Sequence, residues 1–183
     1  MTTKVREVGV GVNVMEKSVT YVANTVIQVL FRIVHGRGLP PNYLQHNLEI
    51  IENGLRTWLS EQKLRFVLLQ VYVPGQKDAL ENWETVFSYY ADPNEDVRKP
   101  PVEEIEEACK NLSKLPPHTT YTIYASVDPG ASEVAGWVRG TPKPLASSVE
   151  KIFKDWGFGN IGAEIRYQGS DMGNTGGGPE RKG

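Results

Sequence analysis

Apolar residues recur at intervals of three and four over two stretches of the first 60 residues, which predicts amphipathic helices. The first stretch runs from Ser18, the expected N-cap, to the Gly36-Arg37-Gly38 break, and it is apolar over a wide face. The second follows Pro40-Pro41 and has a narrower apolar face ending at Leu59. A third helix of the same kind is predicted after Pro100-Pro101, with Cys109 on its apolar face.

Alternating and β-branched runs predict strands elsewhere. Leu64 to Val73 and Leu80 to Tyr90 are joined by Pro74 to Asp78, a turn composition that indicates a hairpin. The segment from Asp92 to Lys99 is polar and is expected to be a loop. The run from Thr119 to Val127 predicts another strand, which stops at Asp128-Pro129-Gly130.

The N-terminal residues also alternate, with period 2. Valines at 8, 10, 12 and 14 are separated by Gly9, Gly11 and Asn13, a pattern typical of a strand with one bare face. We therefore expect residues 1–17 to form an arm that needs a sheet edge to pair with.

Helices and strands are partly segregated along the chain, and neighbouring strands can pair antiparallel. This order predicts an α+β fold in which three helices cover one face of a mainly antiparallel sheet. A core at residues 18–128 would be followed by a different kind of segment, because the 55 residues from Pro129 to Gly183 carry 12 of the 18 glycines. Residues 129–168 still contain large apolar side chains, whereas residues 169–183 have the composition of a disordered tail.

The composition narrows the function classes. The net charge is -2, so no basic surface for nucleic acid is expected. A single cysteine, no secretion signal and no long apolar run predict a cytoplasmic protein without a membrane segment.

Motifs for chemistry are missing from the sequence. The Gly9-Val10-Gly11 run lacks the third glycine of a dinucleotide-binding loop. His35, His46 and His118 have no metal-ligand spacing, and Cys109 is expected to be a core thiol. We therefore expect no enzyme activity, no cofactor and no metal, and a better fit to a protein that captures a peptide at the edge strand Thr119 to Val127.

Several segments, in this order and spacing, resemble the bacterial HORMA-domain proteins. They cover roughly residues 18–140 and comprise Ser18 to Asn24, Leu55 to Leu59, Leu68 to Tyr72, the Trp83 strand, and Tyr121 to Trp137 with its Pro129-Gly130 and Val134 to Trp137 motifs.

The resemblance implies a fold related to the spindle-checkpoint HORMA proteins, in which a C-terminal "safety belt" wraps over a bound peptide, the closure motif. It implies a role in a CBASS anti-phage system, where such a protein activates a cGAS/DncV-like nucleotidyltransferase and an AAA+ ATPase reopens the belt. The HORMA protein itself would be a two-state switch without catalytic activity.

Carried onto this chain, the resemblance implies that the peptide lies along Tyr121, Ile123, Ala125 and Val127. The belt would begin after Val127 and comprise residues 129–168, with Pro129, Gly130, Gly136 and Trp137 in it.

An alternative role stays open, because some of these operons encode two HORMA proteins. The chain would then be a scaffold or second HORMA partner whose own belt does not switch. Its tail after Gly169, or its arm with Val10, Val12, Val14 and Met15, would be the closure motif bound by another belt.

Overall fold

The computed structural model describes residues 2–146 and 149–169, with side chains from residue 14 onward. The tail expected at residues 169–183 lies outside the described residues except for Gly169, which ends the last strand. The helices are α1 (Thr2–Gly36), α2 (Asn42–His46), α3 (Leu48–Ser60) and α4 (Val102–Asn111). The strands are β1 (Leu64–Tyr72), β2 (Glu81–Arg98), β3 (Thr120–Val127), β4 (Val149–Ile152) and β5 (Trp156–Gly169).

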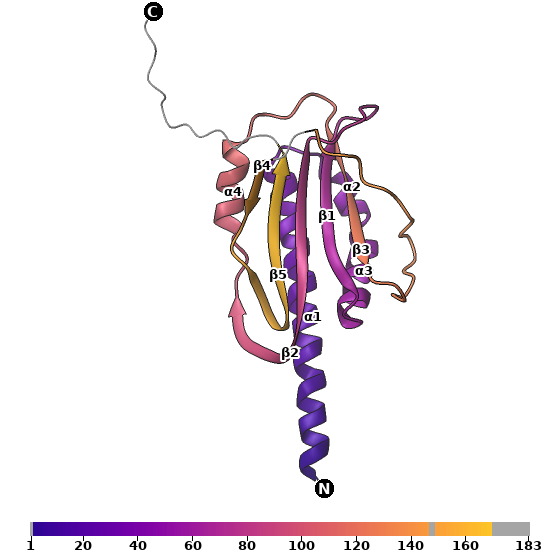
Figure 1. The fold of residues 1–183 in the computed structure, drawn as a ribbon, viewed down its shortest axis with the longest axis vertical. Coiled ribbons are helices and arrows are strands. Elements are labelled where there is room, and N and C mark those ends of the chain that lie inside the picture. The colour runs from indigo at the N-terminus through magenta and orange to yellow at the C-terminus, as the bar shows by residue number, and fades with distance from the viewer. Residues whose placement is uncertain (1, 147–148, 170–183) are drawn as a thin grey trace, which may run out of the picture.

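The five strands form one sheet in the order β3-β1-β2-β5-β4, and every neighbouring pair is antiparallel. The helices lie behind this sheet as it is drawn in Figure 1, with α1 at the centre. The predicted α+β fold with helices on one face is therefore confirmed. In the described part of the chain, β3 and β4 are the two edges of the sheet.

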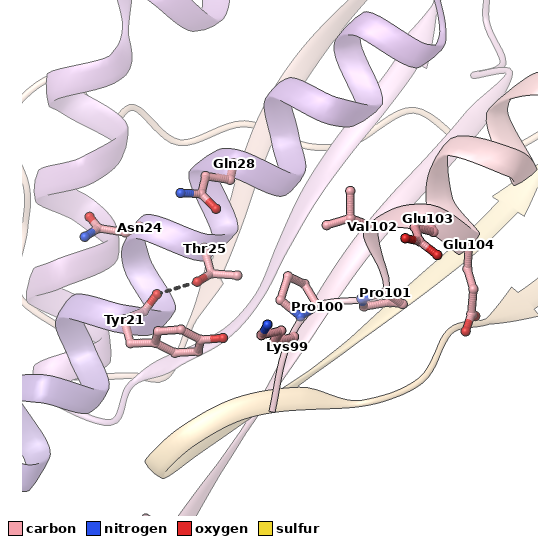
Figure 2. A pocket seen from close by; sticks show the side chains of 10 residues that line it. All are labelled: Tyr21, Asn24, Thr25, Gln28, Lys99, Pro100, Pro101, Val102, Glu103 and Glu104. Atoms are coloured by element: carbon pink, nitrogen blue, oxygen red, sulfur yellow. Dashed lines mark hydrogen bonds between the residues drawn. The ribbon is translucent and has the colours of Figure 1, made fainter. Parts of the chain in front are cut away.

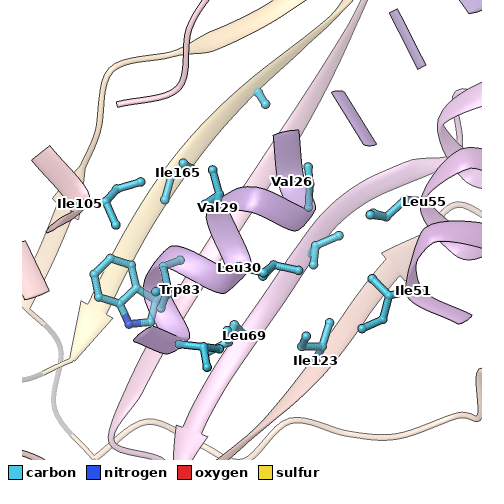
Figure 3. Packing of buried hydrophobic residues seen from close by; sticks show 14 of the residues in the cluster. Val26, Val29, Leu30, Ile51, Leu55, Leu69, Trp83, Ile105, Ile123 and Ile165 are labelled. Atoms are coloured by element: carbon cyan, nitrogen blue, oxygen red, sulfur yellow. The ribbon is translucent and has the colours of Figure 1, made fainter. Parts of the chain in front are cut away.

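The core lies between the helices and the sheet. Figure 3 shows Val26, Val29 and Leu30 of α1 lying among side chains from the other layers. The sheet contributes Leu69, Trp83, Ile123 and Ile165, α3 contributes Ile51 and Leu55, and α4 contributes Ile105, all of them buried. The expected core thiol Cys109 is buried beside Gly36, and burial raises its pKa to about 12.

The strand expected at Val8 to Val14 is wrong, because α1 already begins at Thr2. Ser18 is not an N-cap either: it lies within the helix, where its hydroxyl donates to the Val14 carbonyl at 2.7 Å. Extending an existing helix avoids the cost of nucleation, so valine and glycine can continue one that would not start there. The predicted end of the helix is confirmed, with α1 ending at Gly36 and Gly38 at φ 66°.

Two other boundaries differ from expectation. Asn47 interrupts the second predicted helix, which becomes α2 and α3. The polar segment from Asp92 onward is not a loop, because β2 continues to Arg98 and pairs irregularly with β5 at Gly159 and Gly157. Glycines remove the side chains that would otherwise separate the two backbones at these positions.

Candidate functional site

The edge strand β3 has main-chain groups that face away from the sheet. The Asp128 N–H donates to the Lys63 carbonyl at 2.8 Å, so Asp128 points toward β1. At the other end of β1, the Val71 carbonyl accepts from the Leu80 N–H, so the main-chain groups of Val71 point toward β2. Those of its neighbour Gln70 therefore point toward β3, where Thr122 lies opposite. The N–H and C=O of one strand residue point the same way and alternate along the strand.

The hydrogen bonds at both ends of the β1–β3 pairing indicate the same alternation of main-chain direction along β3. Thr122, Tyr124 and Ser126 turn their main-chain groups toward β1, and Tyr121, Ile123, Ala125 and Val127 turn theirs outward. Within the described residues, no hydrogen bond from outside the sheet reaches the main chain of Ile123, Ala125 or Val127. β3 is thus an open edge with three consecutive pairs of donors and acceptors available.

A channel runs along this edge. Its volume is about 1170 Å³, with β3 residues Ile123–Val127 on one side and residues 131–141 on the other. We call residues 128–146 the belt segment. It leaves the end of β3, runs beside that strand, and returns across the sheet at the β1–β2 connection (Figure 1).

Trp137 anchors the middle of the belt segment on α3. Its indole N–H donates to the Ile50 carbonyl at 2.9 Å, and its ring lies edge-on to Trp58 with 5.1 Å between centroids. Gly54 of α3 leaves room for this ring, because a Cβ there would lie 2.5 Å from the Trp137 nitrogen. Gly136, at φ 89°, packs in the same way against Ile50.

The start of the belt segment is held by polar contacts. The Lys63 ammonium donates to the Pro129 carbonyl at 3.2 Å, and Arg65 pairs with Asp128. The Trp58 indole N–H donates to the Ser132 carbonyl at 2.7 Å. Ser132 donates in turn to Glu61, and these hydrogen bonds keep the pKa of the Glu61 carboxyl below its usual value.

Gln70 holds the far end of the belt segment. This side chain is fully buried, and its amide donates to the Lys143 carbonyl at 3.0 Å and accepts from the Lys143 N–H at 2.8 Å. Nearby, the Ala79 N–H donates to the Pro144 carbonyl and the Ala79 carbonyl accepts from Ala146. The belt segment is therefore fixed at both ends and in the middle.

The residues expected from the sequence are only partly brought together. Ile123, Ala125 and Val127 line the channel with Trp137 and Gly136, while Pro129 and Gly130 are in the belt segment but are not among the lining residues. The main-chain groups of Tyr121 also point outward, but its buried side chain is bonded elsewhere. Its hydroxyl donates to the Pro40 carbonyl and accepts from the Leu44 N–H. Val14 and Met15 are half-buried within helix α1.

Sequence reasoning missed three contributors to the site, Trp58, Gln70 and Lys143. Trp58 could be placed on the apolar face of its helix but not opposite another tryptophan. Gln70 did leave a signal, because an amide within the apolar run Leu68 to Val71 must find polar partners if it is buried.

A second hollow of about 680 Å³ lies between α1 and the start of α4. Figure 2 shows its lining, in which Glu103 and Glu104 from α4 lie across from Tyr21 and Thr25 of α1. The Thr25 hydroxyl is already bonded to the Tyr21 carbonyl at 2.7 Å. This hollow has no open strand edge, so the β3 channel is the better candidate for a peptide.

Neither a metal-binding cluster nor a membrane-spanning helix is found in the described residues. No group of three or more histidine, cysteine, aspartate or glutamate side chains is arranged to hold a metal ion there. No helix in that part of the chain has the length and apolar character needed to cross a membrane.

Comparisons with known proteins agree with this geometry. The model of the family described as "Bacterial HORMA domain 2" matches residues 7–167. No curated protein matches the chain.

Solved structures share the fold. A chain of the mitotic checkpoint complex has a TM-score of 0.70 at 14% identity, covering 82% of this chain and 97% of that one. C. elegans HTP-2, bound to the HIM-3 closure motif, has a TM-score of 0.66 at 14% identity, covering 85% and 91%. A chain of the CdnC:HORMA-deltaN complex of E. coli MS115-1 has a TM-score of 0.55 at 14% identity, covering 82% and 87%.

Proposed function

The chain belongs to the bacterial HORMA domain 2 family, and on that premise we propose that it binds a closure-motif peptide as an added strand on β3. The peptide-bound form would then help to activate a cGAS/DncV-like nucleotidyltransferase in a cytoplasmic CBASS antiviral system. The observation that carries the proposal is the open main-chain edge of Ile123, Ala125 and Val127, which faces a channel closed by the belt segment.

The physical gain comes from the main chain. An added strand would pair with donors and acceptors that otherwise face only solvent, while its side chains enter the channel. The belt segment is continuous with β3 at one end and is bonded at the β1–β2 connection at the other. A bound peptide would therefore be enclosed, and its release would require the belt segment to move.

The proposal includes two protein partners, each on its own ground. A protein that locks its ligand behind a covalently continuous segment needs a way to reset, which fits an AAA+ remodelling ATPase. The nucleotidyltransferase partner is supported by a structural relative, the HORMA chain of the complex with CdnC. Regulation of the nucleotidyltransferase requires no catalytic group in this chain.

The peptide-binding step is tested by Ala125→Pro. Proline removes an N–H that points into the channel, and an edge strand tolerates proline where its N–H faces outward. We expect the variant to stay folded and a peptide selected from a random library to bind at least about tenfold more weakly, measured by fluorescence anisotropy. Tyr124→Pro is the matched control, because it removes an N–H that points toward β1 and should lower the unfolding free energy instead.

The regulatory step is tested with the nucleotidyltransferase. Product formation is measured with the enzyme alone, with this protein, and with this protein plus the selected peptide. The proposal expects stimulation only in the last case, and its loss with Ala125→Pro. Absence of both binding and stimulation under every peptide condition would contradict it.

A scaffold role without switching is the second candidate, and the packing of β5 favours it. Gly159 approaches Ser18 of α1 so closely that repositioning this strand would undo a buried contact. A scaffold predicts that peptide leaves the protease sensitivity of residues 129–168 unchanged, whereas belt closure predicts that peptide protects them.

A further inference from the structure

Two charged side chains of opposite sign line the β3 channel, and both come from the belt segment. They are Glu133 and Arg139, which are exposed, and we call them the channel charges. The strand on the other side of the channel, β3, has no charged residue between Thr120 and Val127. The charges that a bound peptide meets in the channel are therefore set by the belt segment.

The channel charges lie toward different ends of the channel, because the belt segment runs back along β3. Glu133 is in the first part of this segment, soon after β3 ends at Val127. Arg139 precedes Gly140, where a Cβ would lie 3.4 Å from the Tyr124 ring, so it lies nearer the middle of β3. The stretch of β3 from Tyr124 to Val127 is about 10 Å long, so the channel charges face peptide positions about three or more residues apart.

Neither channel charge has a partner within the described part of the chain. The other two charged residues of the belt segment are bonded: Asp128 pairs with Arg65, and the Lys143 ammonium donates to the Gln76 carbonyl at 2.7 Å. The channel charges, by contrast, make no hydrogen bond or ion pair with any described residue. Each can therefore pair with a peptide side chain without breaking a bond inside the protein.

The wall between the channel charges is apolar. Val134 and Trp137 pack against the core cluster but remain half-exposed. A peptide against this wall would exclude water from around the channel charges, and the interaction between charges strengthens as water is excluded. An opposite charge on the peptide is then favoured at each end, and a like charge is disfavoured.

On the premise of the proposed peptide binding, we propose that Glu133 and Arg139 determine which peptides the channel accepts. An accepted peptide has a basic side chain beside Glu133, an acidic side chain beside Arg139, and apolar side chains between them. A peptide with the same sign of charge at both ends is rejected, because one end would bring like charges together.

The test starts from the tightest-binding peptide selected from a random library on the full-length wild type. Two versions of it are made, one with its basic residue replaced by glutamate and one with its acidic residue replaced by lysine. We expect each version to bind the wild type at least about threefold more weakly in fluorescence anisotropy, because an attraction becomes a repulsion.

Charge reversal in the protein assigns each effect to one residue. Glu133→Lys should restore binding of the glutamate version to within about twofold of the original pair, and Arg139→Glu should not. Arg139→Glu should restore binding of the lysine version, and Glu133→Lys should not. Both side chains are exposed, so the circular dichroism of the two variants should match that of the wild type.

Glu95→Lys is the matched control. Glu95 is exposed on β2, which lies two strands from β3 in the sheet. The variant changes the net charge as much as Glu133→Lys does, but at physiological salt a charge at this separation is largely screened. If Glu95→Lys restored binding of the glutamate version equally well, only the net charge would matter and the assignment to Glu133 would be overturned.

The outcomes separate this inference from the proposed function. If the selected peptide has no basic or acidic residue, or if its charge-inverted versions bind the wild type less than about threefold more weakly, the charge rule is wrong. Weaker binding of the same peptide to Ala125→Pro would still support the proposed function in that case. If no library peptide binds the wild type, the proposed function is wrong and this inference fails with it.

Discussion

The belt segment precedes strand β5 in the chain, with β4 between them, but the two are held in place by different contacts. β5 is fixed by burial: Trp156, Ile161, Ile165 and Tyr167 are fully covered, and the strand pairs on both sides. Residues 128–146 contain no named helix or strand and are fixed by one tryptophan and a few polar contacts. The segment that encloses the channel is therefore held by a few separate attachments and not by extensive burial.

The glycines of the two regions have different packing environments. In β5, Gly157 and Gly159 have φ values of 146° and 61°, and a Cβ at Gly159 would overlap the Ser18 hydroxyl. In the belt segment, Gly136 packs against Ile50, a flexible side chain. The glycines of β5 permit close backbone packing, so their abundance in the sequence marks ordered structure there.

The largest effect is expected from Gly159→Ala. The left-handed backbone costs an alanine about 1–2 kcal/mol, and overlap with Ser18 adds about 1–3 kcal/mol. Unfolding in urea should show the loss. Gly75→Ala is the matched control, because Gly75 has φ 86° but nothing within 4 Å of its missing Cβ, so it should lose only the first contribution. Equal losses in the two variants would show that β5 is not closely packed.

The packing of helices on one face of the sheet could be predicted because the apolar spacing is regular between residues 18 and 127. The resemblance implied that a peptide lies along Tyr121, Ile123, Ala125 and Val127, but the outward direction of their main-chain groups could not be predicted, since it depends on how β3 pairs with β1. The start of α1 was misjudged because valine and glycine alternation is also compatible with helix elongation from residues 18–36. Nothing local in the sequence could place Trp137 opposite Trp58, since these residues are joined only by the folded chain.

Gly54→Ala should loosen the belt segment without weakening the body. An added methyl group stabilises helix α3 by about 1 kcal/mol, but it would occupy the space that the Trp137 ring fills. We expect faster amide hydrogen exchange at residues 132–140, and faster release of a bound peptide by about tenfold or more. Unchanged exchange there would mean that Trp137 does not anchor the belt segment.

A smaller effect is expected from Gln70→Leu. Leucine keeps the side-chain volume but leaves the Lys143 N–H and carbonyl without the partners that Gln70 provides. The loss should destabilise the attachment at this end of the belt segment by about 1–3 kcal/mol. Hydrogen exchange should accelerate at Lys143 and remain unchanged at Trp137. Acceleration along the whole segment would show that the two attachments act as one unit.

The smallest effect concerns Cys109, which distinguishes opening of the belt segment from opening of the body. Its thiol is buried beneath α1, and its pKa of about 12 keeps it protonated at pH 8, so alkylation requires the body to open. Gly54→Ala and Gln70→Leu should therefore leave the rate of iodoacetamide labelling within about twofold of wild type, whereas Gly159→Ala should raise it, because this rate follows the opening free energy. If loosening the belt segment alone accelerated labelling, the belt segment and the body would be a single cooperative unit, and peptide release would then require unfolding of the body.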